Sequence, residues 1–127
     1  MAEHNEFGKV GEEEAVSYLR SKGYSILHRN WRSGKHELDI IAENSEYLII
    51  VEVRARSGGY LLHPIDSVGP RKIRNIILAA EKYIFANNIE KETRFDIISV
   101  VVNSKGESCI EHIEDAFLPL SCFNVFF

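Results

Sequence analysis

Four charged side chains lie within or directly after stretches whose pattern otherwise indicates burial. Glu52 and Arg54 follow the apolar residues 48–51. Asp39 lies inside a second apolar segment, and Glu12 lies on the apolar side of the N-terminal segment. Carboxylates that share a buried region repel one another and are costly to desolvate, so they are expected to bind protons or a cation. An oxygen-only ligand set without cysteine favours Mg²⁺ or Mn²⁺ over Zn²⁺.

These residues would support one kind of chemistry. A divalent ion held by two or three carboxylates, with water in its other positions, polarises a phosphodiester and lowers the pKa of a bound water. Arg54 follows Glu52 by two residues, so in an extended strand both side chains emerge on the same side. There the guanidinium can hold a phosphate or stabilise its developing charge. The residue set therefore favours metal-assisted hydrolysis of a phosphodiester.

Glu12 lies in a segment, residues 5–22, that has the pattern of a helix. At about 100° per residue, Glu12 falls inside the apolar arc of this helix, whereas Glu13 lies well outside it. Gly8 and Gly11 lie within the same arc. An interior glycine costs up to about 1 kcal/mol relative to alanine and is usually tolerated for close backbone approach. A simpler interpretation, in which Glu12 borders the core and the glycines ease packing, stays open.

The other carboxylates lie on expected strands. Apolar segments indicate strands over residues 24–28, 38–42 and 47–54, and the polar residues 43–46 predict a turn that makes the last two an antiparallel hairpin. With a four-residue turn, Asp39 would face Ile50 and lie diagonal to Glu52. Asp39, Glu52 and Arg54 would then share one face of the sheet, together with Glu37. A slip of one residue would separate them.

The C-terminal half predicts a loop, a helix and two further strands. Turn-forming residues 57–70 lead into a helix that starts near Pro70 and ends around residues 87–88. Lys72 lies at the edge of its isoleucine stripe and should point toward the sheet. Residues 95–102 read as a central strand reached by a right-handed parallel crossover, and residues 109–113 as a last strand. We therefore expect an α/β fold in a single domain over residues 1–127.

Composition limits the classes of partner. With 45% hydrophobic and 27% charged residues, the 127-residue chain can bury a core of its own. It has no apolar run of membrane-spanning length and no signal-like N-terminus, so we expect a cytoplasmic protein without a membrane partner. Cys109 and Cys122 lack CxxC spacing and are expected to be reduced thiols. Because the net charge is −4, any polyanion partner requires a local basic patch or a bound cation.

Six motifs follow one another between Gly8 and Phe117. They are Gly8-x-x-Gly11-Glu12-x-x-Ala15, Asn30-Trp31-Arg32, Glu37-Leu38-Asp39-Ile40-Ile41-Ala42, Val51-Glu52-Val53-Arg54-Ala55-Arg56, Lys72, and Arg94-Phe95-Asp96. This ordered series resembles the YraN-like family of bacterial proteins. That family is similar in turn to the Holliday-junction-resolvase branch of the PD-(D/E)XK nuclease superfamily.

The resemblance implies a restriction-endonuclease-like αβββαβ core, in which helices flank a mixed central sheet. It also implies a magnesium-dependent, or manganese-dependent, endonuclease site that acts on DNA, including branched or structured DNA, and it suggests a homodimer. Carried over by position, the catalytic residues are Glu12, Asp39, Glu52 and Arg54, of which the three acidic residues bind the metal. The expected substrate contacts are Arg32, Arg56 and Lys72.

Arg54 is the main departure from the superfamily pattern, which has a lysine there. Arginine binds phosphate but cannot be deprotonated, so it cannot serve as a general base. A protein that binds nucleic acid without cleaving it therefore stays open as an alternative. His36 is a second departure and is interpreted as a loop histidine. A third hypothesis, a protein-interaction module, rests on the acidic balance and the aromatic tail over residues 123–127.

Overall fold

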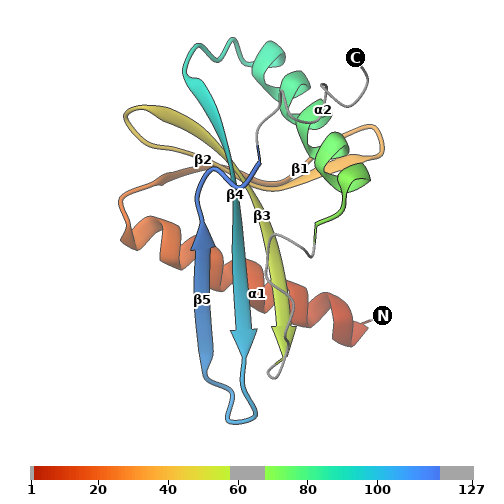
Figure 1. Cartoon of the computed structure of the whole chain (residues 1–127), viewed down its shortest axis with the longest axis vertical. Helices are drawn as coiled ribbons and strands as arrows, with labels where there is room; N and C mark the ends of the chain where they lie inside the picture. The colour runs from red at the N-terminus through yellow and green to blue at the C-terminus, as the bar shows by residue number, and fades with distance from the viewer. Residues whose placement is uncertain (1, 58–67, 118–127) are drawn as a thin grey trace.

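The computed structural model describes residues 2–57 and 68–117 (Figure 1). The aromatic tail, Cys122 and most of the predicted 57–70 loop lie outside the described residues. In chain order the elements are α1 (Ala2–Ser21), β1 (Ser25–Ser33), β2 (His36–Glu43), β3 (Tyr47–Ser57), α2 (Pro70–Ala86), β4 (Glu92–Val102) and β5 (Ser108–Ile113). Neither helix is long and apolar enough to cross a membrane in the described part of the chain.

The five strands form one mixed sheet in the order β1-β2-β3-β4-β5. Strands β3 and β4 run parallel, and the other neighbours are antiparallel. This confirms the predicted α/β fold, and the order of elements is that of a restriction-endonuclease-like core. Strand β1 continues to Ser33 rather than ending at residue 28, because an edge strand can turn polar side chains toward solvent.

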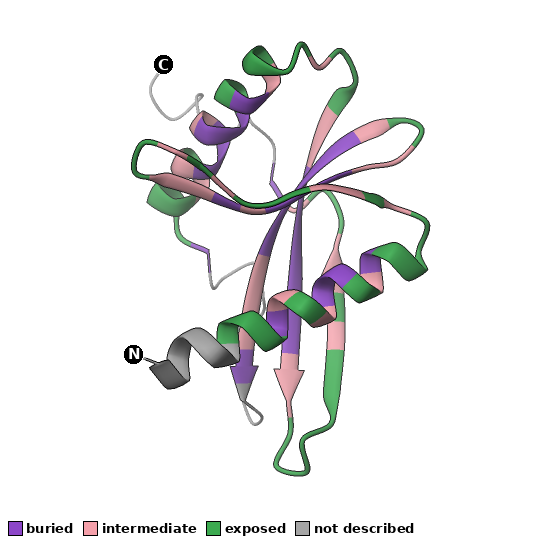
Figure 2. Ribbon diagram, turned by 180° about the vertical axis from the view of Figure 1, so that it is seen from behind, coloured by how far each residue is buried: buried purple, intermediate pink, exposed green. Residues whose placement is uncertain are grey.

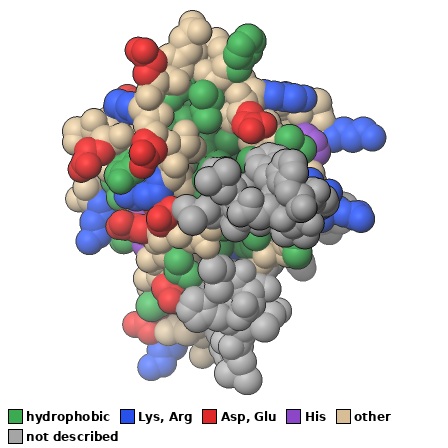
Figure 3. All heavy atoms as spheres, turned by 45° about the horizontal axis from the view of Figure 1, so that its top comes forward, with side chains coloured by type: hydrophobic (Ala, Val, Ile, Leu, Met, Phe, Trp, Pro, Cys, Tyr) green, Lys and Arg blue, Asp and Glu red, His purple; other side chains and the backbone are tan. Residues whose placement is uncertain are grey.

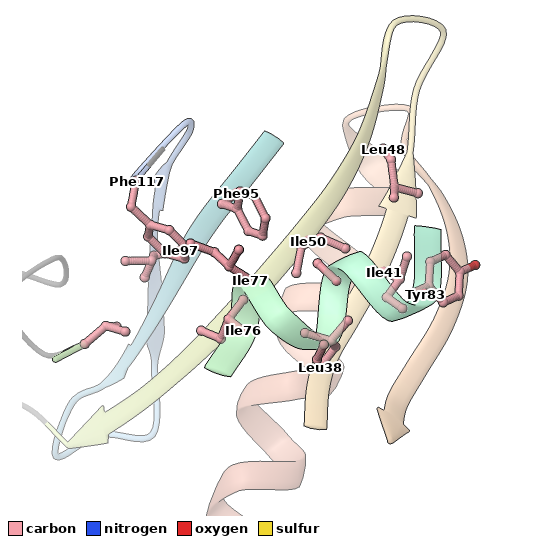
Figure 4. Close-up of a cluster of buried hydrophobic side chains, with 13 residues drawn as sticks. Leu38, Ile41, Leu48, Ile50, Ile76, Ile77, Tyr83, Phe95, Ile97 and Phe117 are labelled. Carbon is pink, nitrogen blue, oxygen red and sulfur yellow. The ribbon is translucent and has the colours of Figure 1, made fainter. Parts of the chain in front are cut away.

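Two clusters of buried side chains lie on the two faces of the sheet. Alternate residues of β3 enter different clusters: Ile49 packs with Leu19 of α1, and Ile50 packs with Ile77 of α2. Figure 2 shows α1 crossing the sheet, and Figure 4 shows the cluster beneath α2. Burying a Leu or Ile side chain contributes about 1.5–3 kcal/mol, so both helices are firmly fixed on the sheet.

The β2–β3 hairpin is present, but the predicted register is wrong by two residues. Ile50 pairs with Ile41 rather than with Asp39. The turn is tighter than predicted because Glu43 stays in β2 and the Asn44 carboxamide accepts two backbone N–H groups, at 2.9 and 2.7 Å. Since side chains alternate with a period of two, a two-residue shift leaves each side chain on its predicted face.

Of the two helix glycines, only Gly11 lies close to other backbone. A Cβ at Gly11 would lie 2.6 Å from Cβ of Ala55, so α1 approaches β3 more closely there than any larger residue allows. A Cβ at Gly8 would meet nothing within 4 Å. The close approach considered for both glycines is therefore confirmed at Gly11 and wrong at Gly8.

A buried polar network fastens α1 and β5 to β4. The Asp96 carboxylate is fully buried and accepts two hydrogen bonds from Arg94, both at 2.9 Å, and one from Nε2 of His112 at 2.7 Å. The other ring nitrogen of His112 lies 3.1 Å from the hydroxyl of Tyr18. Burial raises the pKa of Asp96, but the hydrogen bonds from His112 and Arg94 outweigh it, and the pKa ends below its ordinary value.

Candidate functional site

Asp39 lies where β2 and β3 separate. The paired residues of these strands end at Ile40 and Val51. Beyond that pair, Oδ2 of Asp39 accepts the backbone N–H of Val53 at 2.9 Å. A side-chain carboxylate thus provides the acceptor that a backbone carbonyl provides elsewhere in the sheet. This hydrogen bond holds the Asp39 carboxylate at the point where β2 and β3 separate.

Glu52 and Asp39 form a buried carboxylate pair. The side chain of Glu52 is 4% exposed, and when it carries a proton it donates a hydrogen bond to the carboxylate of Asp39. Burial, together with the neighbouring Asp39, raises the pKa of Glu52 to about 8. Burial also raises the pKa of Asp39, an effect that the Val53 N–H partly offsets. The two carboxylates therefore need a shared proton or a cation between them.

Two cations border the pair without neutralising it. Nη1 of Arg54 lies 3.5 Å from Oε2 of Glu52, and Nζ of Lys72 lies 3.8 Å from the same oxygen. Both contacts are long for charge-assisted hydrogen bonds, which are usually about 2.7–2.9 Å. The predicted direction of Lys72, toward the sheet, is confirmed. Both cations remain partly exposed, so they can also contact an anion that approaches from solvent.

Glu12 lies apart from the pair. Its side chain is 14% exposed against 65% for Glu13, as the helical arc predicted. Oε1 of Glu12 accepts hydrogen bonds from Asn30 at 2.9 Å and from Arg29 at 3.3 Å. Burial raises the pKa of Glu12, Asn30 and Arg29 oppose the rise, and the charge of Asp39 adds to it. Glu12 is thus within electrostatic reach of Asp39 while bonded elsewhere.

The predicted substrate contacts fall into two groups. Arg32 and Lys72 line a cavity of about 250 Å³ between the β1–β2 turn and α2, whereas Arg56 is buried. The cavity is also lined by Lys35 and Asn75, which were not predicted as site residues. Lys35 follows Arg29 and Arg32 in a basic cluster of the sequence, but no sequence signal places Asn75 opposite the β1–β2 turn.

The donor set fits a hard divalent cation in part. Asp39 and Glu52 offer carboxylate oxygens at one point, and Arg54 and Lys72 offset their charge only in part, which suits Mg²⁺ or Mn²⁺. Among residues 8–57 and 68–117, no three His, Cys, Asp or Glu side chains are grouped closely enough to hold a metal ion. The arrangement of described residues therefore provides two ligands, with the remaining positions left to water or substrate, and Glu12 would join only by releasing Arg29 and Asn30.

Comparison with known proteins places these residues in a family. The model of "Uncharacterised protein family UPF0102" matches residues 11–100, which include Glu12, Asp39 and Glu52. A UPF0102 protein of Phocaeicola vulgatus is 52% identical over 119 residues, covering 94% of this chain and 98% of the relative. A UPF0102 protein of Flavobacterium psychrophilum is 49% identical over 117 residues, covering 92% and 98%. One from Porphyromonas gingivalis is 48% identical over 119 residues, covering 92% and 87%. The chain belongs to the UPF0102 family, which confirms the YraN-like resemblance.

Proposed function

We propose that this protein is a metal-dependent endonuclease that hydrolyses phosphodiester bonds in DNA, including branched or structured DNA. The observation that carries the proposal is the buried pair of Asp39 and Glu52, bordered by Arg54 and Lys72 at the junction of β2 and β3. Two buried carboxylates without enough compensating charge are destabilising unless a ligand stabilises them. A bound cation would balance the negative charge of the carboxylates, and a phosphate bound with it would balance the positive charge of the two basic side chains.

Each residue has a role in this proposal. Asp39 and Glu52 would hold Mg²⁺ or Mn²⁺, which when bound supplies Lewis-acid polarisation of the phosphodiester. The Val53 N–H keeps the Asp39 carboxylate in one orientation. Arg54 and Lys72 would bind the phosphate oxygens and stabilise the charge that develops on them. Glu12, which bonds to Asn30, would act at longer range by keeping the field around Asp39 negative.

One observation favours a second function, in which the protein binds DNA without cutting it. Arg54 lies where the superfamily has a lysine, and it already contacts Glu52. A guanidinium cannot give up its proton to orient or activate water, although it can hold a phosphate. In this case DNA binding should weaken with rising salt, persist in EDTA and lead to no turnover.

The deciding experiment uses four-way-junction, single-stranded and duplex DNA with Mg²⁺ or Mn²⁺. Wild type is compared with Asp39→Ala, Glu52→Ala and the control Glu46→Ala, which removes an exposed carboxylate at the β2–β3 turn. We expect metal-dependent cleavage that disappears in the first two variants and persists in the control, with all four proteins folded. Cleavage that survives both site substitutions would contradict the site assignment.

Arg54→Lys separates the two functions. If wild type binds DNA without cleaving it and Arg54→Lys cleaves, the natural arginine limits the reaction at an otherwise competent site. If wild type and Arg54→Lys cleave equally, only a positive charge is needed at this position. Absence of cleavage from both proteins, with binding that persists in EDTA, would favour the binding function.

A further inference from the structure

The cavity between the β1–β2 turn and α2 adjoins the carboxylate pair through one shared residue. Lys72 lines this cavity, and its Nζ lies 3.8 Å from Glu52. The volume of about 250 Å³ is well above the roughly 10–15 Å³ that one ordered water needs. Figure 1 shows the β1–β2 turn next to the start of α2, and Figure 3 shows Lys, Arg and His side chains along one edge of the molecule.

The charges that line the cavity are mainly positive. Arg32, Lys35 and Lys72 contribute three cations, against the single carboxylate of Glu37. Arg32 donates to Glu37 at 3.1 Å, which offsets one charge of each sign. Lys35 makes no ion pair with any other described residue. The cavity thus keeps positive charge on a chain whose net charge is −4.

The stability of α2 does not explain this placement. Lys72 lies in the first turn of α2, a turn that contains no acidic residue and whose cap residue, Gly69, makes no side-chain hydrogen bond. A cation at a helix N-terminus is opposed by the helix dipole, by about 0.3–1 kcal/mol for an exposed site. In the free protein only the long contact with Glu52, at 3.8 Å, offsets this cost, and an anion bound in the cavity would offset more of it.

The remaining groups supply hydrogen-bond donors for an anion. His36 lies on the β2 side of the cavity, and Asn75 lies on the α2 side with an amide that can donate. Arg32 uses Nε for Glu37, so the two terminal nitrogens of its guanidinium are available to a tetrahedral anion. Glu37 is the one lining group that opposes an anion, and Arg32 screens it.

We propose that this cavity binds the backbone phosphate next to the one held at the carboxylate pair, so that a DNA strand passes over Lys72 from one site to the other. The inference rests on the proposed function, because it places the same strand in both sites. Contacts to backbone phosphates fix position without reading bases, so this subsite would orient the strand independently of sequence.

The test measures DNA affinity in EDTA over a range of salt concentrations. Lys35→Ala is compared with Lys105→Ala, which removes the same charge from the exposed β4–β5 turn. We expect Lys35→Ala to lower affinity about fivefold at low salt and to reduce the salt slope by about 1, with Lys105→Ala close to wild type. Glu37→Gln should act in the opposite direction and raise affinity. Circular dichroism checks that each variant is folded.

A second measurement locates the phosphate. A methylphosphonate replaces one charged phosphate of an oligonucleotide by a neutral group. When it is moved along the strand, it should weaken binding to wild type at two neighbouring positions. With Lys35→Ala, it should still weaken binding at one of these positions and have no effect at the other. Equal affinities of Lys35→Ala and Lys105→Ala, or no DNA binding by wild type, would overturn the subsite. Wild type that binds with this Lys35 dependence but never cleaves would contradict the endonuclease function and support the subsite.

Discussion

Replacing Glu52 by glutamine removes one carboxylate of the buried pair while keeping its shape. In the folded protein the pKa of Glu52 is raised from 4.5 to about 8 by burial and by Asp39. The folded state therefore binds a proton more tightly than the unfolded state between these two pH values. Stability from this group is fully present below about pH 4.5 and is lost as pH rises toward 8. The burial that raises the pKa of Asp39 acts in the same direction.

The size of the effect follows from the pKa. A rise from 4.5 to about 8 corresponds to about 5 kcal/mol above pH 8, at about 1.4 kcal/mol per pKa unit. Glutamine also loses the ion pairs with Arg54 and Lys72, each worth up to about 1 kcal/mol. We therefore expect Glu52→Gln to be more stable than wild type by about 2–3 kcal/mol at pH 8.5 and nearly equal at pH 5.

The assay is urea unfolding in EDTA at both pH values, with free energies of unfolding for wild type, Glu52→Gln and the exposed control Glu46→Gln. Adding Mg²⁺ at pH 8.5 should raise the stability of wild type and leave Glu52→Gln nearly unchanged, since binding to the folded state alone is stabilising. If the free energies of unfolding of wild type and Glu52→Gln differ by the same amount at pH 5 and pH 8.5, the ionised carboxylate pair does not destabilise the folded protein, and the reasoning is refuted.

Two further changes test how the scaffold holds the site. Gly11→Ala should lower the free energy of unfolding by about 1–3 kcal/mol because its Cβ would lie 2.6 Å from Ala55, whereas Gly8→Ala should be neutral or raise it by up to about 1 kcal/mol; equal effects in thermal unfolding would contradict the close approach. Asp96→Asn should cost about 3–5 kcal/mol at pH 7 because it removes the fully buried carboxylate of the ion pair and leaves Arg94, 11% exposed, with only the Tyr24 hydroxyl and the longer Glu114 contact at 3.5 Å. Because the pKa of Asp96 is lowered, its contribution is lost as pH falls below about 4, and urea unfolding at pH 3 should show a smaller difference.

The sequence predicted elements better than it predicted their ends. Periodicity placed both helices and every strand, and Glu12 and Lys72 point as expected because their positions follow from helical geometry alone. The predicted register was wrong because charged residues are typical of turns, and Glu43 was therefore assigned to the turn. In the structure Glu43 stays in β2 and forms an ion pair at 2.9 Å with Lys91, which directly precedes β4. A contact between residues so far apart in sequence leaves no local signal.

Which side chains meet at the site was harder to predict than which face of the sheet each strand residue lies on. Alternation assigned Asp39 and Glu52 to one side of the sheet, and they do meet. The pairing of Glu12 with Asn30 depends on a left-handed backbone, with φ of 53°, that asparagine tolerates better than most residues. Nothing in the sequence around Asn30 distinguishes this conformation from an ordinary strand.

The hydrogen bond from Val53 to Asp39 gives the site a spectroscopic reporter. Most amides of a central strand exchange their hydrogens only when the sheet opens, whereas the Val53 amide is held by a titratable carboxylate. Its chemical shift and exchange rate should respond to the charge on Asp39, and thus to protons or cations bound at the pair. One backbone amide therefore allows occupancy of the site to be followed by nuclear magnetic resonance without a substrate.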